Sequence, residues 1–176
     1  VPQLPATTER NLLVVGALAD VVEDQLRRLF DELGIGAVQF FPPRRSSELP
    51  PVGPNTKLLL AQPFLGDTLR ALEARCAERL SAPFPLGAEG TTLWLQAAAR
   101  EWRVPEERVR AAIAPGIERA RRAVSRHRFQ LAGKRIFLFP DSQLEVPLAR
   151  FLARELDMVP VEIGTPYLHR KHLAAE

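Results

Sequence analysis

The chain has 176 residues, of which 46% are apolar and 26% charged, a balance typical of a globular protein with room for one good core or one and a half α/β domains. No apolar run approaches the ~20 residues of a membrane-spanning helix. Its single cysteine excludes an intramolecular disulfide framework, so we expect a cytoplasmic setting. The sequence has neither an initiator methionine nor a secretory leader, and we expect it to be part of a longer protein.

The first hundred residues alternate short apolar runs with amphipathic stretches. They predict strands at 12–15, 38–41 and 57–61, and helices at 20–33, 67–80 and 91–102. We expect Asp20 to cap the first helix and Gly34 to end it. This order of elements predicts an α/β fold, a three-layer Rossmann-like unit with a parallel sheet.

A basic helical segment follows, and we expect Pro115 and Gly116 to break or kink it. The net charge of the whole chain is only +3, but much of its positive charge is concentrated between Arg119 and Arg135. A second α/β unit is then predicted from a strand at 135–139, a helix at 143–156 and a strand at 159–163. The predicted domains are therefore 1–104, a connector at 105–132, and 133–176 as the start of a further Rossmann-like domain.

The stretch from Phe139 to Glu145 predicts a binding loop at the tip of a buried strand. Ser142 and Glu145 have the spacing of a capping box, which predicts a helix starting at Gln143 with free N–H groups at its first turn. Ligands of open α/β sheets bind at such strand tips. Asp141 has two interpretations, an ordinary turn residue or a polar group that lines a pocket.

The sequence lacks the common short motifs of nucleotide binding, nucleophilic catalysis and metal binding. Gly34-Ile35-Gly36 lacks the third glycine of a dinucleotide fingerprint, and the stretch 87–92 resembles a phosphate loop without its lysine. There is no nucleophile elbow, and the three histidines do not have the spacing of a metal site. Composition and these motifs therefore leave the reaction open.

Two further features have competing interpretations. Cys76 falls on the apolar stripe of its predicted helix, which indicates a buried, inert thiol; a ligand role would need partners outside this chain. The basic helix could be a solvated face, a docking face for an acidic partner, or a nucleic-acid site. The last is disfavoured because no aromatic platform accompanies the charge, and no nucleic-acid partner is expected.

Several of these segments together resemble subunit N of the dark-operative, light-independent protochlorophyllide reductases, a nitrogenase-like family. The resemblance covers roughly residues 10 to 173, and its most specific part is the stretch from Ala82 to Leu95. The other matching segments are 14–25, 52–66, 139–152 and 163–169.

The resemblance implies a catalytic component in which N and B subunits form a heterotetramer. A separate ATP-hydrolysing iron–sulfur subunit, L, which would bind the ATP and Mg²⁺, delivers electrons that come from ferredoxin. The implied reaction reduces the C17–C18 double bond of protochlorophyllide to give chlorophyllide a. A [4Fe–4S] cluster is implied on three cysteines of the N subunit and one aspartate of the B subunit, all outside this chain, so no metal site is expected here and no catalytic residue is assigned.

The resemblance also places a substrate cavity at the strand tips. Gln62 and Pro63 stand where nitrogenase has a cofactor-ligating cysteine, which fits a pocket for an organic tetrapyrrole. The expected cavity-lining residues are Leu18, Gln62, Pro63, Phe64, Phe84, Asp141, Ser142 and Gln143. The alternatives are the related chlorophyllide reductase, nitrogenase proper, or a non-catalytic Rossmann-type domain for ligand binding or interaction.

Overall fold

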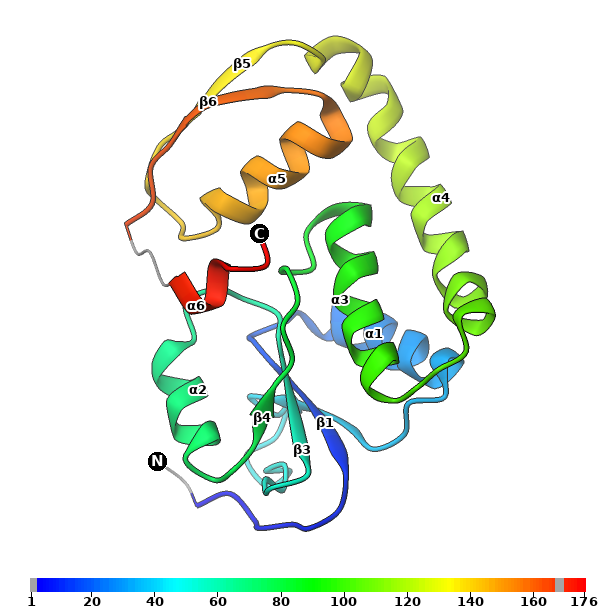
Figure 1. Cartoon of the computed structure of the whole chain (residues 1–176), viewed down its shortest axis with the longest axis vertical. Helices are drawn as coiled ribbons and strands as arrows, with labels where there is room; N and C mark the ends of the chain where they lie inside the picture. Colours follow the sequence, from blue (N-terminus) through cyan, green and yellow to red (C-terminus); the bar gives the residue numbers. More distant parts are fainter. Residues whose placement is uncertain (1–2, 167–169) are drawn as a thin grey trace.

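The computed structural model describes residues 3–166 and 170–176, and it forms two α/β units joined by a long helix (Figure 1). The strands are β1 (Asn11–Val15), β2 (Val38–Phe41), β3 (Thr56–Leu60), β4 (Glu78–Arg79), β5 (Arg135–Leu138) and β6 (Val159–Ile163). The helices are α1 (Asp20–Leu33), α2 (Gly66–Glu73), α3 (Gly87–Glu101), α4 (Glu106–Leu131), α5 (Glu145–Leu156) and α6 (Arg170–Leu173). The predicted α/β class with parallel sheets is confirmed.

The first unit is a parallel sheet in the order β2-β1-β3-β4, covered on both faces. Successive strand residues point to opposite faces, so Leu12 and Val14 pack with α1, α3 and α4, whereas Leu13 and Val15 pack with α2. Every residue of β1 is buried, as expected for the central strand of a parallel sheet. The layers are therefore helix, sheet and helix.

Several element ends differ from the sequence prediction. Helix α1 begins after Ala19, so Asp20 is its first residue and not its cap, whereas Gly34 ends it in the left-handed conformation as predicted. Helix α2 stops at Glu73, a turn follows at 74–76, and the chain then forms the short strand β4, which the sequence did not reveal. Helix α3 begins at Gly87, a turn earlier than predicted.

Helix α4 links the two units and continues through Pro115, so the predicted break does not occur. The second unit pairs β5 and β6 in parallel, and α5 packs against β6. The expectation of a buried strand at 135–139 was wrong: Phe137 is 51% and Phe139 72% exposed. Within the described residues β5 pairs with a single strand, β6, and a sheet of two strands is too small to cover its apolar side chains.

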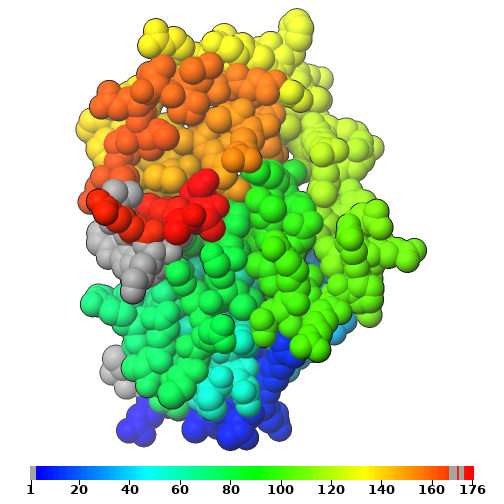
Figure 2. Space-filling view, viewed as in Figure 1, coloured from blue at the N-terminus to red at the C-terminus, as the bar shows by residue number. Residues whose placement is uncertain are grey.

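The last residues return to the first unit. Figure 2 shows the C-terminal residues, in red, at the boundary between the two units. Leu173 of α6 packs against the core cluster that contains Phe84, and the Glu176 carboxylate accepts a hydrogen bond of 2.7 Å from the Phe84 amide. No helix in the described ranges has the length and apolar content to cross a bilayer.

Candidate functional site

The tips of β1 and β3 lie side by side and are fixed to each other by one side chain. The Gln62 amide donates to the Ala17 carbonyl and accepts from the Ala17 N–H, each bond 3.0 Å long. A Cβ added at Gly16 would lie 3.1 Å from the Ala61 Cβ, and its φ of +155° also disfavours other residues. The structure therefore brings together the Leu18 and Gln62 loops, two of the predicted tip segments.

The apolar residues around these tips differ in exposure. Leu18 is half-buried, Pro63 is buried, and Phe64 is 43% exposed. Phe84, in contrast, is only 2% exposed because it packs into the core below α2 and is covered by the C-terminal residues. Phe84 therefore has no open surface on this chain to offer a ligand, whereas Phe64 does.

The loop between β5 and α5 is organised around the Glu145 carboxylate. Its Oε1 accepts hydrogen bonds from the backbone N–H groups of Asp141, Ser142 and Gln143, at 2.9, 2.6 and 3.0 Å. The Ser142 hydroxyl accepts from the Leu144 N–H at 3.2 Å. The prediction of a helix starting at Gln143 with free N–H groups was wrong. Helix α5 starts at Glu145, and the Glu145 carboxylate already accepts the N–H groups of Asp141, Ser142 and Gln143.

The Glu145 carboxylate is buried and ionised. Glu145 is only 3% exposed, and burial alone would raise its pKa. The backbone N–H donors of the loop outweigh burial and hold the pKa of Glu145 below its ordinary value. Glu145 therefore fixes the loop that presents the exposed residues Asp141 and Ser142 and the half-buried Gln143.

A polar junction joins α5 to the start of α3. The Glu155 carboxylate accepts from the Ala88 and Glu89 amides at 3.1 and 3.0 Å, a favourable place for an anion at a helix N-terminus. Arg150, 8% exposed, donates to the Phe84 carbonyl at 3.0 Å and lies 2.8 Å from the buried Glu176 carboxylate. These contacts fix the second unit against the first.

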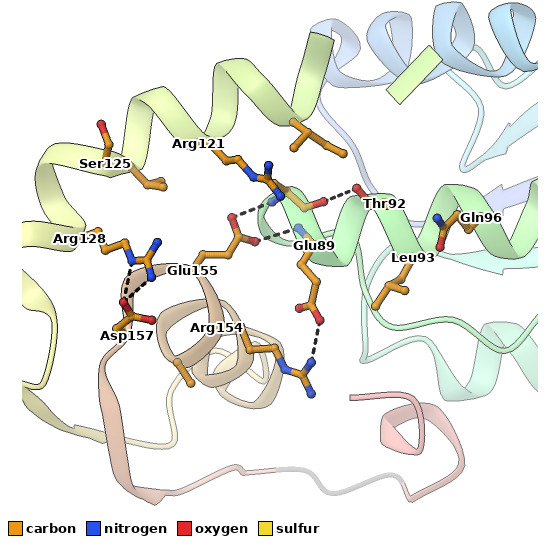
Figure 3. A pocket seen from close by; sticks show the side chains of 14 residues that line it. Glu89, Thr92, Leu93, Gln96, Arg121, Ser125, Arg128, Arg154, Glu155 and Asp157 are labelled. Carbon is orange, nitrogen blue, oxygen red and sulfur yellow. Dashed lines mark hydrogen bonds and ion pairs between the residues drawn. The ribbon is translucent and has the colours of Figure 1, made fainter. Parts of the chain in front are cut away.

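A cleft of about 990 Å³ opens between α3, α4 and α5 (Figure 3). Its acidic side chains already have partners: Glu89 pairs with Arg154 at 2.9 Å, and Asp157 with Arg128 at 2.6 Å. None of the predicted site residues lines this cleft. Only the tertiary packing of three separate helices creates it, so no local sequence pattern could have indicated it.

Among the described residues there is no complete ligand set for an iron–sulfur cluster. Cys76 is its only cysteine, and no group of three or more histidine, cysteine or acidic side chains in the described part could hold a metal ion. The prediction that Cys76 is buried was wrong, because the helix ends before it and Cys76 is exposed in the following turn with a φ of +66°.

Comparison with known proteins identifies the family. A sequence model described as nitrogenase component 1 type oxidoreductase matches residues 6–176. The light-independent protochlorophyllide reductase subunit N of Rubrivivax gelatinosus is 65% identical over 176 residues, which are 100% of this chain and 41% of the relative. The protein of the same name from Bradyrhizobium sp. strain ORS 278 is 66% identical over 180 residues, 100% of this chain and 42% of its own length.

The chain thus spans about two fifths of the length of these relatives. Among solved structures, a crystal structure of ZnuA covers 94% of this chain and 76% of its own, at 12% identity and a TM-score of 0.48. That likeness is too distant to carry an argument. The match of the family model over nearly the whole sequence is decisive: the chain belongs to the nitrogenase component 1 type oxidoreductases.

Proposed function

We propose that this chain is part of the N subunit of a light-independent protochlorophyllide reductase and helps to form its substrate cavity. The observation that carries the proposal is the identity of about 65% over the whole chain to relatives that bear this name. The reaction would reduce the C17–C18 double bond of protochlorophyllide to give chlorophyllide a. The whole assembly would comprise N and B subunits as a heterotetramer, served by the ATP-hydrolysing iron–sulfur subunit L and, upstream, by ferredoxin, in the cytoplasm.

The cofactor of the proposed complex would lie outside this chain. A [4Fe–4S] cluster would supply electrons when bound, with ligands from other parts of the N subunit and from the B subunit, and ATP and Mg²⁺ would bind to the L subunit. The contribution of this chain would be to bind and orient the substrate. A flat, largely apolar macrocycle needs an apolar wall with a few fixed polar groups.

Contacts at the strand tips support this role. Phe64 offers an exposed ring, Leu18 and Pro63 lie in the adjoining loops, and Gln62 is held in one orientation by Ala17. The Asp141, Ser142 and Gln143 loop, fixed by Glu145, is the second proposed wall. Asp141 is only a candidate proton donor. Unchanged turnover in an Asp141→Ala variant would exclude it from that role. Phe84 supports the wall from the core.

Domain organisation is a second proposal. Residues 1–104 form the middle domain, 105–132 the basic connector, and 133–176 begin a further Rossmann-like domain. Parallel sheets are normally buried on both faces, yet Phe137, Val159 and Val161 of β5 and β6 are about half exposed. Further strands and helices of the longer protein would cover them, in keeping with the greater length of the relatives. The residues from Tyr167 to His169 lie outside the described part of the chain.

The test is turnover by the full-length protein assembled with the B and L subunits, in the dark, with ATP and a reductant. The expected product is chlorophyllide a from protochlorophyllide, identified by absorbance and chromatography. Omission of ATP is the control. Reduction of added chlorophyllide a with no reduction of protochlorophyllide would instead identify the related chlorophyllide reductase, and no reduction of either would refute the proposal.

A single variant tests the proposed cavity wall. We expect Phe64→Ala to raise the KM for protochlorophyllide about tenfold, or ~1.4 kcal/mol, because an exposed ring that packs on the substrate loses its apolar contact. Val21→Ala, which removes apolar surface from the exposed side of α1, is the matched control. Unchanged KM and kcat in the Phe64 variant would exclude this residue from the cavity.

A further inference from the structure

A side chain takes the place of the next backbone pairing where β1 and β3 end. The parallel ladder runs to Val15 and Leu60, and the Ala61 N–H then donates to the Val15 carbonyl at 2.9 Å. Bonds of a parallel ladder are evenly spaced, so the next donor would be the Ala17 N–H, with a backbone carbonyl after β3 as its acceptor. The Ala17 N–H instead donates to the Gln62 side chain, whose NH₂ group donates to the Ala17 carbonyl. The Gln62 side chain therefore replaces one backbone pairing.

This pairing uses the whole carboxamide group of Gln62. The Ala17 backbone offers one donor and one acceptor, and a carboxamide matches both in a single orientation. A Cβ added at Gly16 would lie 3.5 Å from the Gln62 Cγ and Oε1, so the side chain packs directly against this glycine. Pro63 disfavours the helical conformation at Gln62, because it restricts the residue before it. The side chain thus starts from a restricted backbone and ends on two hydrogen bonds.

The end of β3 that carries Gln62 is itself anchored in the core. On the β4 edge of this strand, the Leu58 carbonyl accepts from the Leu80 N–H at 2.8 Å. The next carbonyl on this edge, that of Leu60, accepts from the Trp94 indole N–H at 2.7 Å, and Trp94 is fully buried. Gln62 therefore acts from a fixed strand end and holds the chain that leaves β1.

The positions of two neighbouring loops depend on this pairing. Leu18 follows directly after Ala17, in the loop that leaves β1. Phe64 comes two residues after Gln62, in the loop that leaves β3. A side chain is longer than the direct backbone bond that it replaces, so the two chains separate here and yet remain joined. Both partners belong to this chain, so the pairing needs no contribution from other parts of a longer protein.

We propose that Gln62 is a positioning residue of the substrate cavity, whose two hydrogen bonds to Ala17 set how far apart the tip loops of β1 and β3 stand. These loops carry Leu18 and Phe64, which belong to the proposed wall for a flat tetrapyrrole. The proposal rests on the proposed function and deepens it, because it gives Gln62 a role that needs no contact with the substrate. Without this pairing, the substrate itself would have to order the loops, which weakens binding.

The experiment uses the full-length protein assembled with the B and L subunits. Gln62→Met keeps the length of the side chain but removes both hydrogen bonds, so the Ala17 amide should lose about tenfold or more of its protection against hydrogen exchange. The KM for protochlorophyllide should rise about fivefold, while kcat changes less than about twofold. Gln25→Met, at an exposed position of α1, is the matched control and should change none of these quantities.

Gln62→Glu makes the pairing dependent on pH. Its carboxylate cannot donate to the Ala17 carbonyl, whereas its protonated carboxyl group can. Ala17 protection, corrected for the intrinsic exchange rate, should therefore be low at about pH 7 and recover toward about pH 4.5, near the ordinary glutamate pKa of about 4.3. Gln62→Met should show no such recovery, because its side chain has no group that gains a proton.

Loss of Ala17 protection together with the rise in KM would support the proposal. Unchanged protection in Gln62→Met, lost protection with unchanged KM, or no recovery in Gln62→Glu would overturn it. A raised KM with full Ala17 protection would overturn it too, because it would indicate direct contact between Gln62 and the substrate. In all these outcomes the wild-type complex reduces protochlorophyllide, whereas a wild-type complex that does not would refute the proposed function as well.

Discussion

The Glu145 carboxylate offers the sharpest test of how the loop after β5 is held. Glu145→Gln keeps the shape of the side chain but removes the negative charge that accepts three backbone N–H groups on a single oxygen. Hydrogen bonds to a charged group stabilise by about 1.5–3 kcal/mol each, are not additive, and are partly retained by an amide oxygen. We therefore expect a loss of about 2 kcal/mol, or about 30-fold in the opening equilibrium of the loop.

Amide hydrogen exchange measures this opening directly at Asp141, Ser142 and Gln143. At neutral pH their protection should fall about 30-fold in the variant, while amides in β1 stay protected. Glu162→Gln, at an exposed position of the neighbouring strand β6, is the control. Unchanged protection of the three amides in Glu145→Gln would refute the reasoning, because it would mean that the carboxylate does not hold the loop.

The same carboxylate predicts a pH dependence. The pKa of Glu145 is lower in the folded chain than in the unfolded one, so its ionised form stabilises the fold at neutral pH. That contribution is lost as the pH falls below the ordinary glutamate pKa of about 4.3 and through the lowered folded pKa. The wild type should therefore lose loop protection on acidification, whereas Glu145→Gln should show a flatter profile over this range.

Two further predictions concern the junction between the units and the turn before β4. Arg150→Met should lower the free energy of unfolding of the full-length protein by about 3–5 kcal/mol, because it leaves the buried Glu176 carboxylate without its counter-charge and the Phe84 carbonyl without its side-chain donor. In chemical denaturation, Arg154→Met, which removes an exposed partner of Glu89, should cost less than about 1 kcal/mol; equal losses would contradict this account. Cys76 should react with a maleimide in the folded chain at a rate within about tenfold of that of a free cysteine peptide, and strong protection would contradict its exposure.

The amino-acid sequence by itself determined the elements whose signal is local. The continuous apolar run 12–15 and the stripe of α1 ending at Gly34 were predicted and are observed, because a central parallel strand and an amphipathic helix each have a direct hydrophobic pattern. The α/β class with parallel sheets followed from their order. The family resemblance was likewise available from sequence motifs, and the family match over residues 6–176 confirms it.

Tertiary structure decided whatever depends on contacts between distant residues. Phe84 is buried because residues about ninety positions later fold back over it. The cleft between α3, α4 and α5 likewise exists only because three separate helices pack together. Phe137 and Phe139 have a buried-strand pattern but are exposed, since burial needs neighbouring elements as well as apolar residues. The hydrophobic pattern along a segment shows which face of a helix or strand is apolar. The tertiary packing of other elements decides whether that face is covered.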